Sequence, residues 1–178
     1  GAGAPVWDAW DWVRATTQIR TIVDIGANDG SYSRYLNGFF HPGSIHAFEP
    51  LPSCQASLTA LRKQVPHLTV HQLALAEAPG EATFFENGYG PASSLLRISD
   101  VCREVFPETE RETAVTVALA RLDDVLPIDA LERDILIKID VQGVEDRVIR
   151  GGQAMFWGAK MVLVEMSFVP MYQGQPLF

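Results

Sequence analysis

The chain has 178 residues, of which 47% are hydrophobic and 20% charged, values that are ordinary for one globular domain. The formal net charge of −8 argues against a nucleic-acid partner, because nucleic-acid phosphates would be repelled. No apolar run approaches the ~20 residues that a membrane-spanning helix needs. No secretory leader is evident, and Cys54 and Cys102 lack metal-type spacing, so we expect free thiols in a cytoplasmic protein without membrane contact.

Short strands and helices are predicted to alternate along the chain, which is the pattern of a parallel sheet with crossover helices. An N-terminal helical segment is expected within residues 1–18, and the main domain over residues 19–178. Within that domain, strands are predicted at 21–25, 44–48, 68–75, 134–140 and 160–165, helices at 31–39, 52–65 and 144–149, and extended segments at 80–86 and 113–119. The predicted fold class is therefore α/β and Rossmann-like, with a mostly parallel twisted sheet and helices on both faces.

The most informative run, residues 23–30, reads Val-Asp-Ile-Gly-Ala-Asn-Asp-Gly and joins a strand to a helix. Its glycines let a ligand lie against the backbone, and the helix N-terminus offers free N–H groups, which is typical of a nucleotide-like ligand. Asp24 would repel a pyrophosphate but attract the ammonium of a methionine moiety, which favours S-adenosylmethionine over NAD. Asn28 also replaces the middle glycine of a dinucleotide fingerprint. A tight turn without any ligand is the alternative.

The second motif, Phe48-Glu49-Pro50, places an acid at the end of the second predicted strand. A carboxylate there can accept hydrogen bonds from both hydroxyls of an adenosine ribose, as it does in dinucleotide-binding folds. An isolated Glu49 would more often be a surface acid. Beside the glycine turn, however, it is predicted to hold the ribose.

The third motif, residues 138–145, reads Lys-Ile-Asp-Val-Gln-Gly-Val-Glu and sets two ionisable side chains in an apolar strand. Alternate residues of a strand share a face, so Lys138 and Asp140 are expected side by side. A buried charge is costly without a partner or a purpose, which indicates either a structural ion pair or a role in the site. The position of Asp140 at the carboxyl end of the strand favours the site, where it would meet Gly26 and Glu49.

These motifs, with Ala74-Leu75, Ser93-Ser94-Leu95 and Leu122-Asp123-Asp124 between them, resemble the FkbM-type methyltransferases in order and spacing. The resemblance implies a class I, S-adenosylmethionine-dependent enzyme that methylates a hydroxyl on a sugar or natural-product small molecule. It also implies that four residues line the methionine part of the cofactor (Asp24, Gly26, Asn28 and Gly30) while Glu49 holds the ribose. Asp140, together with Lys138 and Glu145, would face the transferred methyl group.

An alcohol is a poor nucleophile at neutral pH, so a base is expected to assist the transfer. Asp140 is the first candidate for that base, with Glu145 and His71 behind it. A divalent ion held by Asp140 and nearby acids is an alternative to a base, but no cluster of His, Asp and Glu demands one, and none is assigned. Residues 93–95 would form either a lid over the substrate or an ordinary surface loop.

The sheet of the resembling family continues past its fifth strand, so the C-terminal strands are expected to be missing from this sequence. An open sheet edge invites pairing, which suggests a homo-oligomer or a parent multidomain chain as partner, besides the small-molecule hydroxyl acceptor. Two other functions stay open. One is a non-catalytic cofactor-binding or docking domain, and the other is a nicotinamide-dependent oxidoreductase, against which Asp24 and Asn28 both count.

Overall fold

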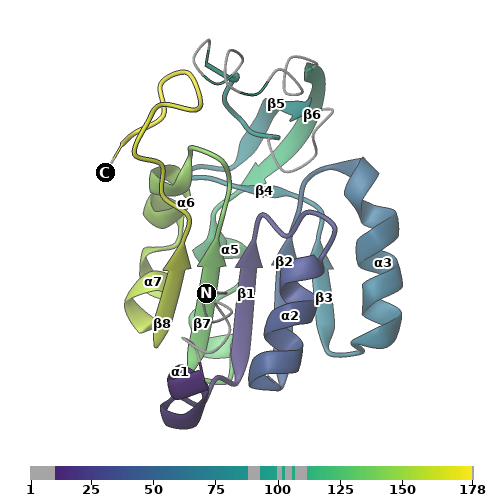
Figure 1. Cartoon of the computed structure of the whole chain (residues 1–178), viewed down its shortest axis with the longest axis vertical. Helices are drawn as coiled ribbons and strands as arrows, with labels where there is room; N and C mark the ends of the chain where they lie inside the picture. Colours follow the sequence, from purple (N-terminus) through teal and green to yellow (C-terminus); the bar gives the residue numbers. More distant parts are fainter. Residues whose placement is uncertain (1–10, 88–92, 100–101, 103–105, 107–111, 178) are drawn as a thin grey trace, which may run out of the picture.

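The computed structural model describes residues 11–87, 93–99, 102, 106 and 112–177. Its centre is a parallel five-stranded sheet (Figure 1). The strands follow the spatial order β3 (Leu68–His71), β2 (Ser44–Phe48), β1 (Thr21–Ile25), β7 (Ile135–Ile139) and β8 (Met161–Val164). The order reverses at β1, and such a switch point is where open α/β sheets bind their ligands.

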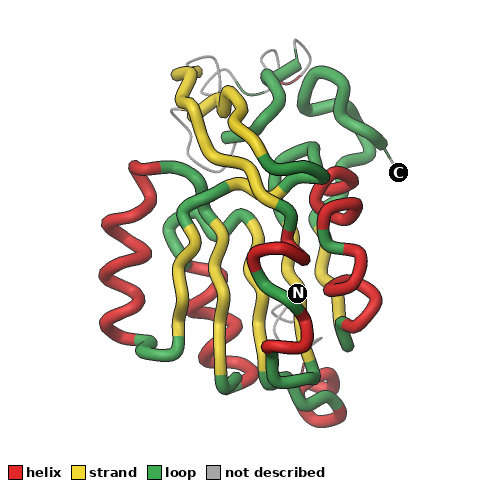
Figure 2. Tube along the Cα trace, turned by 180° about the vertical axis from the view of Figure 1, so that it is seen from behind, coloured by secondary structure: helices red, strands yellow, loops and turns green. Residues whose placement is uncertain are grey.

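Helices cover both faces of this sheet, as Figures 1 and 2 show from opposite sides. On one face lie α2 (Ser31–Phe40) and α3 (Gln55–Gln64), whose buried leucines pack with Ile22 and Ile45. On the other face lie three short helices, α5 (Leu122–Val125), α6 (Glu145–Gly151) and α7 (Gln153–Gly158). A short helical turn, η2 (Pro52–Cys54), precedes α3, and another, η5 (Ile128–Ala130), follows α5. Helix α1 (Asp11–Thr16) leads into β1.

The sequence of the central strands explains why they are buried on both faces. All five residues of β1 and all five of β7 are buried, as near-continuous apolar runs in parallel sheets usually are. Successive residues point to opposite faces, so Ile22 packs under α2 and α3 while Val23 packs under the other helices. Only Asp24 and Lys138 interrupt this apolar pattern with charge. They lie directly opposite each other in the register of β1 and β7.

A second, three-stranded sheet lies beyond the carboxyl ends of the main strands (Figure 1). It contains β4 (Ala74–Leu75), β6 (Glu112–Ala120) and β5 (Gly80–Asn87), and β5 runs antiparallel to β6. The prediction of one continuous strand over 68–75 was therefore wrong. Residues 68–71 pair with β2, whereas Ala74 and Leu75 pair with β6, because the chain passes from one sheet to the other in between.

Helix α7 was not predicted, because Gly151 and Gly152 were taken as the end of the preceding helix. The helix resumes at Gln153, and the carboxylate of Asp123 accepts hydrogen bonds of 3.0 Å from the backbone N–H groups of Ala154 and Met155. This cap stabilises the new helix start. Among the residues described, no helix is long and apolar enough to cross a membrane. Both cysteines are free thiols, as predicted.

Candidate functional site

A cavity opens at the carboxyl ends of β1, β2 and β7, under the three-stranded sheet. It contains about 670 Å³ of space not filled by atoms, including space open to solvent. Four of the predicted site residues line it, namely Gly26, Asn28, Glu49 and Asp140. The sequence argument that parallel strands gather these residues at one edge of the sheet therefore holds.

Gly26 brings the turn after β1 against the loop after β7. Its φ of +75° is a left-handed conformation, and a Cβ atom there would lie 1.9 Å from the carbonyl oxygen of Asp140. The N–H groups of Gly26 and Ala27 both donate to the carbonyl oxygen of Phe48 at 3.0 Å. Only glycine allows this approach, and it joins the ends of all three strands into one wall of the cavity.

Glu49 presents a carboxylate to the cavity although the residue is only 5% exposed. Its Oε2 accepts a hydrogen bond of 2.8 Å from the N–H of Asn28, and its Oε1 accepts one of 2.9 Å from the N–H of Leu51. Burial raises the pKa of this carboxyl, while the two backbone hydrogen bonds and the charge of Lys138 oppose the rise. The backbone thus fixes the orientation of the carboxylate, which keeps lone pairs for a ligand.

Asp24 and Lys138 form an ion pair below the cavity. Asp24 is fully buried, and its Oδ2 accepts a hydrogen bond of 2.6 Å from the hydroxyl of Ser33. Its Oδ1 lacks a properly oriented hydrogen bond but lies 3.2 Å from Lys138 Nζ, so the ion pair compensates its charge. Lys138 Nζ also donates to the carbonyl oxygen of Gly26 at 2.7 Å. Of the two interpretations of Lys138 that the sequence left open, this geometry is that of the structural ion pair.

Two other predicted site residues do not line the cavity. A Cβ on Gly30 would lie 2.7 Å from a methyl carbon of Leu61, so this glycine allows the start of α2 to pack closely on α3. Glu145 folds back over the loop after β7, where its carboxylate accepts hydrogen bonds of 3.1–3.2 Å from the N–H groups of Val141 and Gly143. Both residues shape the site from outside it.

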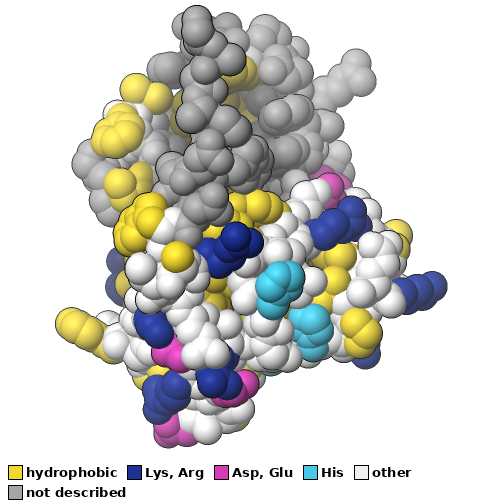
Figure 3. Space-filling view, turned by 60° about the horizontal axis from the view of Figure 1, so that its bottom comes forward, with side chains coloured by type: hydrophobic (Ala, Val, Ile, Leu, Met, Phe, Trp, Pro, Cys, Tyr) yellow, Lys and Arg dark blue, Asp and Glu magenta, His cyan; other side chains and the backbone are white. Residues whose placement is uncertain are grey.

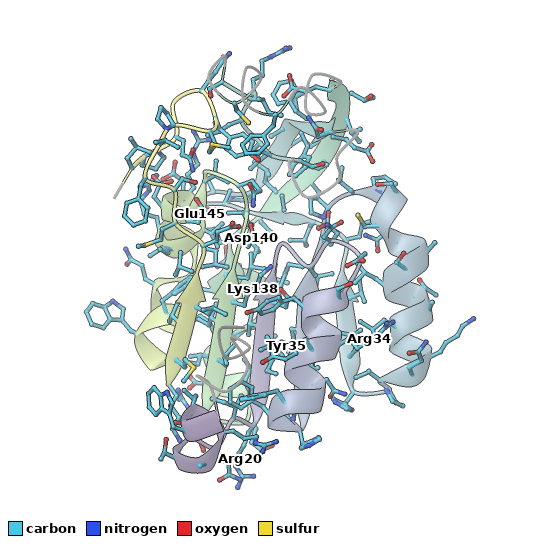
Figure 4. The ribbon with its side chains drawn as sticks, in the orientation of Figure 1. Arg20, Arg34, Tyr35, Lys138, Asp140 and Glu145 are labelled. Atoms are coloured by element: carbon cyan, nitrogen blue, oxygen red, sulfur yellow. The ribbon has the colours of Figure 1, made fainter. Side chains whose placement is uncertain are left out.

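Asp140 also lines a second hollow, which lies beside the cavity between β7, β8 and α2. This hollow contains about 550 Å³ of empty space, including open solvent, and the charged residues on its wall are Lys138, Asp140 and Glu165. In Figure 4 the labelled Lys138, Asp140 and Glu145 lie in a row toward the carboxyl end of β7. Asp140 is therefore the predicted residue that borders both spaces.

Three residues near Asp140 were not predicted from the sequence to belong to the site. Gln142 Nε2 donates hydrogen bonds to Asp140 Oδ1 at 2.5 Å and to Glu165 Oε2 at 2.9 Å, and Tyr172 Oη donates to Gln142 Oε1 at 2.7 Å. A hydrogen bond with Asp140, then burial, then the charge of Asp140 raise the pKa of Glu165 to about 7. The sequence held a signal for Glu165, because it ends the predicted strand 160–165. Gln142 lies within the motif 138–145 but was given no role there, and the sequence held no signal for Tyr172.

The remaining wall of the cavity is apolar and comes partly from the segment 93–95. Ser93 and Leu95 line the cavity, together with Leu73, Leu75 and Phe84. Ser94 is buried, and its hydroxyl donates a hydrogen bond of 2.6 Å to the carbonyl oxygen of Gln142. The segment is thus packed against the loop after β7.

His71, the third candidate base, lies on β3 and is not on the cavity wall. Its ring stacks on Phe48 with 4.3 Å between ring centres and lies 3.3 Å from His46. Burial and the neighbouring imidazole lower the pKa of His71 to about 4. Across the described residues, no three His, Cys, Asp or Glu side chains are arranged to hold a metal ion.

The end of the sheet opposite the cavity carries side chains of both charges. In the view from that end, basic and acidic side chains lie among one another (Figure 3), and Arg20 pairs with Glu132 at 2.5 Å.

Known proteins resemble this chain along most of its length. Residues 24–178 match the family described as the methyltransferase FkbM domain. The 2-O-methyltransferase NoeI of Sinorhizobium fredii is 29% identical over 160 residues, covering 86% of this chain and 66% of that protein. Methyltransferase sdnD of Sordaria araneosa is 33% identical over 162 residues, covering 76% of this chain and 61% of that protein. The chain thus spans under two thirds of the length of these curated relatives.

A solved structure shares the fold. The crystal structure of methyltransferase FkbM from Methylobacillus flagellatus KT has a TM-score of 0.56 and 14% identity, covering 83% of this chain and 33% of that chain. Its likeness confirms the predicted α/β, Rossmann-like class. The family match extends over the glycine turn, Glu49 and the loop after β7, which together form the cavity. The chain therefore belongs to the methyltransferase FkbM domain family.

Proposed function

We propose that this chain is the catalytic domain of an S-adenosylmethionine-dependent O-methyltransferase that acts on a hydroxyl group of a small molecule. The observation that carries the proposal is the buried carboxylate of Glu49, which faces the same cavity as the Gly26 turn and Asp140. Family membership supports methyl transfer, and the name of the relative NoeI supports oxygen as the atom that is methylated.

The residues of the cavity fit the proposed cofactor in three respects. Glu49 offers carboxylate lone pairs to the two ribose hydroxyls, and its backbone hydrogen bonds already hold it in place. The absent side chain of Gly26 leaves the backbone open to a ligand. The apolar wall formed by Leu73, Leu75 and Phe84 suits an adenine ring.

When bound, S-adenosylmethionine supplies an activated methyl group on a positively charged sulfur. The chain then contributes orientation, exclusion of water and removal of a proton from the acceptor hydroxyl. Glu49 orients the nucleoside, and Glu145 fixes the loop that carries Asp140. Asp140 borders both the cavity and the second hollow, so an acceptor in the hollow would meet the cofactor beside it.

Calorimetric titration of S-adenosylmethionine into the wild type and Glu49→Gln tests this function. The variant should bind about 10- to 100-fold more weakly, since hydrogen bonds to a charged group contribute roughly 1.5–3 kcal/mol. Glu81→Gln, a change at an exposed position of β5, is the matched control and should bind like the wild type. Circular dichroism would confirm that each variant is folded. Equal affinities of the wild type and Glu49→Gln would refute the ribose role of Glu49.

A further inference from the structure

Two carboxyl groups from neighbouring parallel strands meet beside the cavity. Asp140 directly follows β7 and Glu165 directly follows β8, and the N–H of Glu165 donates to the carbonyl oxygen of Ile139 at 3.1 Å. The amide of Gln142 donates to both carboxylates, at 2.5 Å and 2.9 Å, and Tyr172 fixes that amide from the other side. The strand register and the shared amide thus hold the two carboxylates close together, although Glu165 itself is exposed.

The surrounding charges do not neutralise both acids. Lys138 Nζ lies 3.8 Å from Asp140 Oδ2 but 3.2 Å from Asp24 Oδ1, so its single charge is shared with a fully buried carboxylate. Within the described part of the chain, Tyr32 from α2 and Tyr172 also face the pair, and burial is the main cause that raises the pKa of each phenol. Both phenols therefore stay neutral, and two ionised acids would repel each other.

A direct hydrogen bond between two carboxyl groups needs one proton between them. The raised pKa of Glu165, about 7, follows first from such a bond with Asp140. Glu165 consequently exchanges its proton near neutral pH, where a general base works most efficiently.

We infer that Asp140 and Glu165 form one proton-holding unit, which loses its proton when the cationic cofactor binds and then accepts the hydroxyl proton of the methyl acceptor at Glu165. This inference rests on the function proposed above. It assigns the second hollow, with Glu165 on its wall, to an uncharged hydroxyl compound, because the ionised pair would repel an anionic acceptor.

The step balances in atoms and charge. The acceptor oxygen forms a bond to the methyl carbon, the bond between that carbon and sulfur breaks, and its electron pair stays on sulfur. The hydroxyl proton moves to a carboxylate oxygen of Glu165, and Asp140 shares it through their hydrogen bond. The positive charge lost at sulfur is thus matched by the negative charge lost at the pair, so no net charge is created in the site.

Proton release on binding tests the inference without a known acceptor. S-adenosylmethionine and S-adenosylhomocysteine share the same amino acid and nucleoside, but only the first is charged at sulfur. Calorimetric titrations at pH 7 in buffers of different ionisation enthalpy count the protons released by each. Because the pKa of Glu165 is about 7, the charged ligand should release up to about half a proton more than the neutral one.

Glu165→Gln should remove the difference in proton release between the two ligands, while Glu81→Gln, at an exposed position, should keep that difference. Equal proton release for the two ligands in the wild type would overturn the inference and leave the proposed cofactor site intact. If neither ligand binds, the proposed function fails, and the inference fails with it.

A second measurement does not depend on the variant or the ligand. Carbon-13 NMR of the side-chain carboxyl of Glu165 in the wild type should show titration near pH 7. Titration only in the ordinary range of glutamate, roughly pH 4–5, would overturn the inference even if Glu165→Gln does not fold.

Discussion

Gly26 is the residue on which the site depends most directly, since it combines a positive φ with a close backbone contact. Gly26→Ala should destabilise the protein by roughly 2–5 kcal/mol, because left-handed strain adds to a forced displacement of the loop at Asp140. Gly38→Ala is the matched control, because a Cβ on this α2 residue would meet nothing within 4 Å. The control should be neutral or stabilising by up to about 1 kcal/mol. Denaturant unfolding measures both variants, and equal effects would contradict this role of Gly26.

At the same scale, the sequence was sufficient to locate the cavity residues that directly follow the ends of strands. Gly26, Asn28, Glu49 and Asp140 line the cavity as a group. Their roles toward a cofactor stay predictions. Asp24, Gly30 and Glu145 were grouped with them from sequence, yet their contacts are with the fold itself: an ion pair, a helix contact and a loop. Lys138, the partner of Asp24 in that ion pair, also lines the second hollow. Sequence spacing places a residue at a sheet edge but does not decide which neighbour its side chain meets.

At the scale of the elements, His71 on β3 should make the free energy of unfolding depend on pH. Burial is the main cause that lowers the pKa of His71 to about 4 in the folded state, from an ordinary 6.5. Between these values the unfolded chain binds more protons, so the contribution of His71 to stability is present above pH 6.5 and lost as the pH falls toward 4. His71→Gln should therefore flatten the rise of the unfolding free energy between pH 4 and 6.5, relative to the wild type.

Urea unfolding at several pH values measures this change, and the exposed His41→Asn serves as control because asparagine tolerates its left-handed backbone. The comparison must be made between variants, because Glu49 and Glu165 have raised pKa values and shift stability in the opposite direction. An unchanged slope in His71→Gln would show that burial of its ring does not control the acid sensitivity of this strand pair.

The elements themselves were predicted where local pattern and tertiary packing agree. The strands at 21–25 and 44–48 have the predicted limits, because apolar runs in a parallel sheet are buried on both faces. The segment 68–75 was predicted as one strand, since nothing local marks the passage between two sheets at residues 72–73. Helix α7 was missed because its cap, Asp123, lies 31 and 32 residues before the two N–H groups that it accepts from.

At the scale of the whole molecule, the chain is a layered α/β domain with its candidate site at a single end. The switch point at β1 gathers the turns after β1, β2 and β7 around one cavity, and the second sheet lies over it. Composition and strand pattern were enough to predict this arrangement, because βαβ connections and buried parallel strands allow few alternatives. The second sheet was not predicted as a separate unit.

The most direct test of the central claim is a map of amide chemical shifts during titration with S-adenosylhomocysteine, and separately with NAD. S-adenosylhomocysteine should shift the amides around Gly26, Asn28, Glu49, Leu75 and Asp140, which line the cavity, while NAD should leave them unchanged at equal concentration. Shifts caused by NAD at these amides, or shifts by S-adenosylhomocysteine confined to other parts of the chain, would contradict the assignment of this cavity to a methyl-donor cofactor.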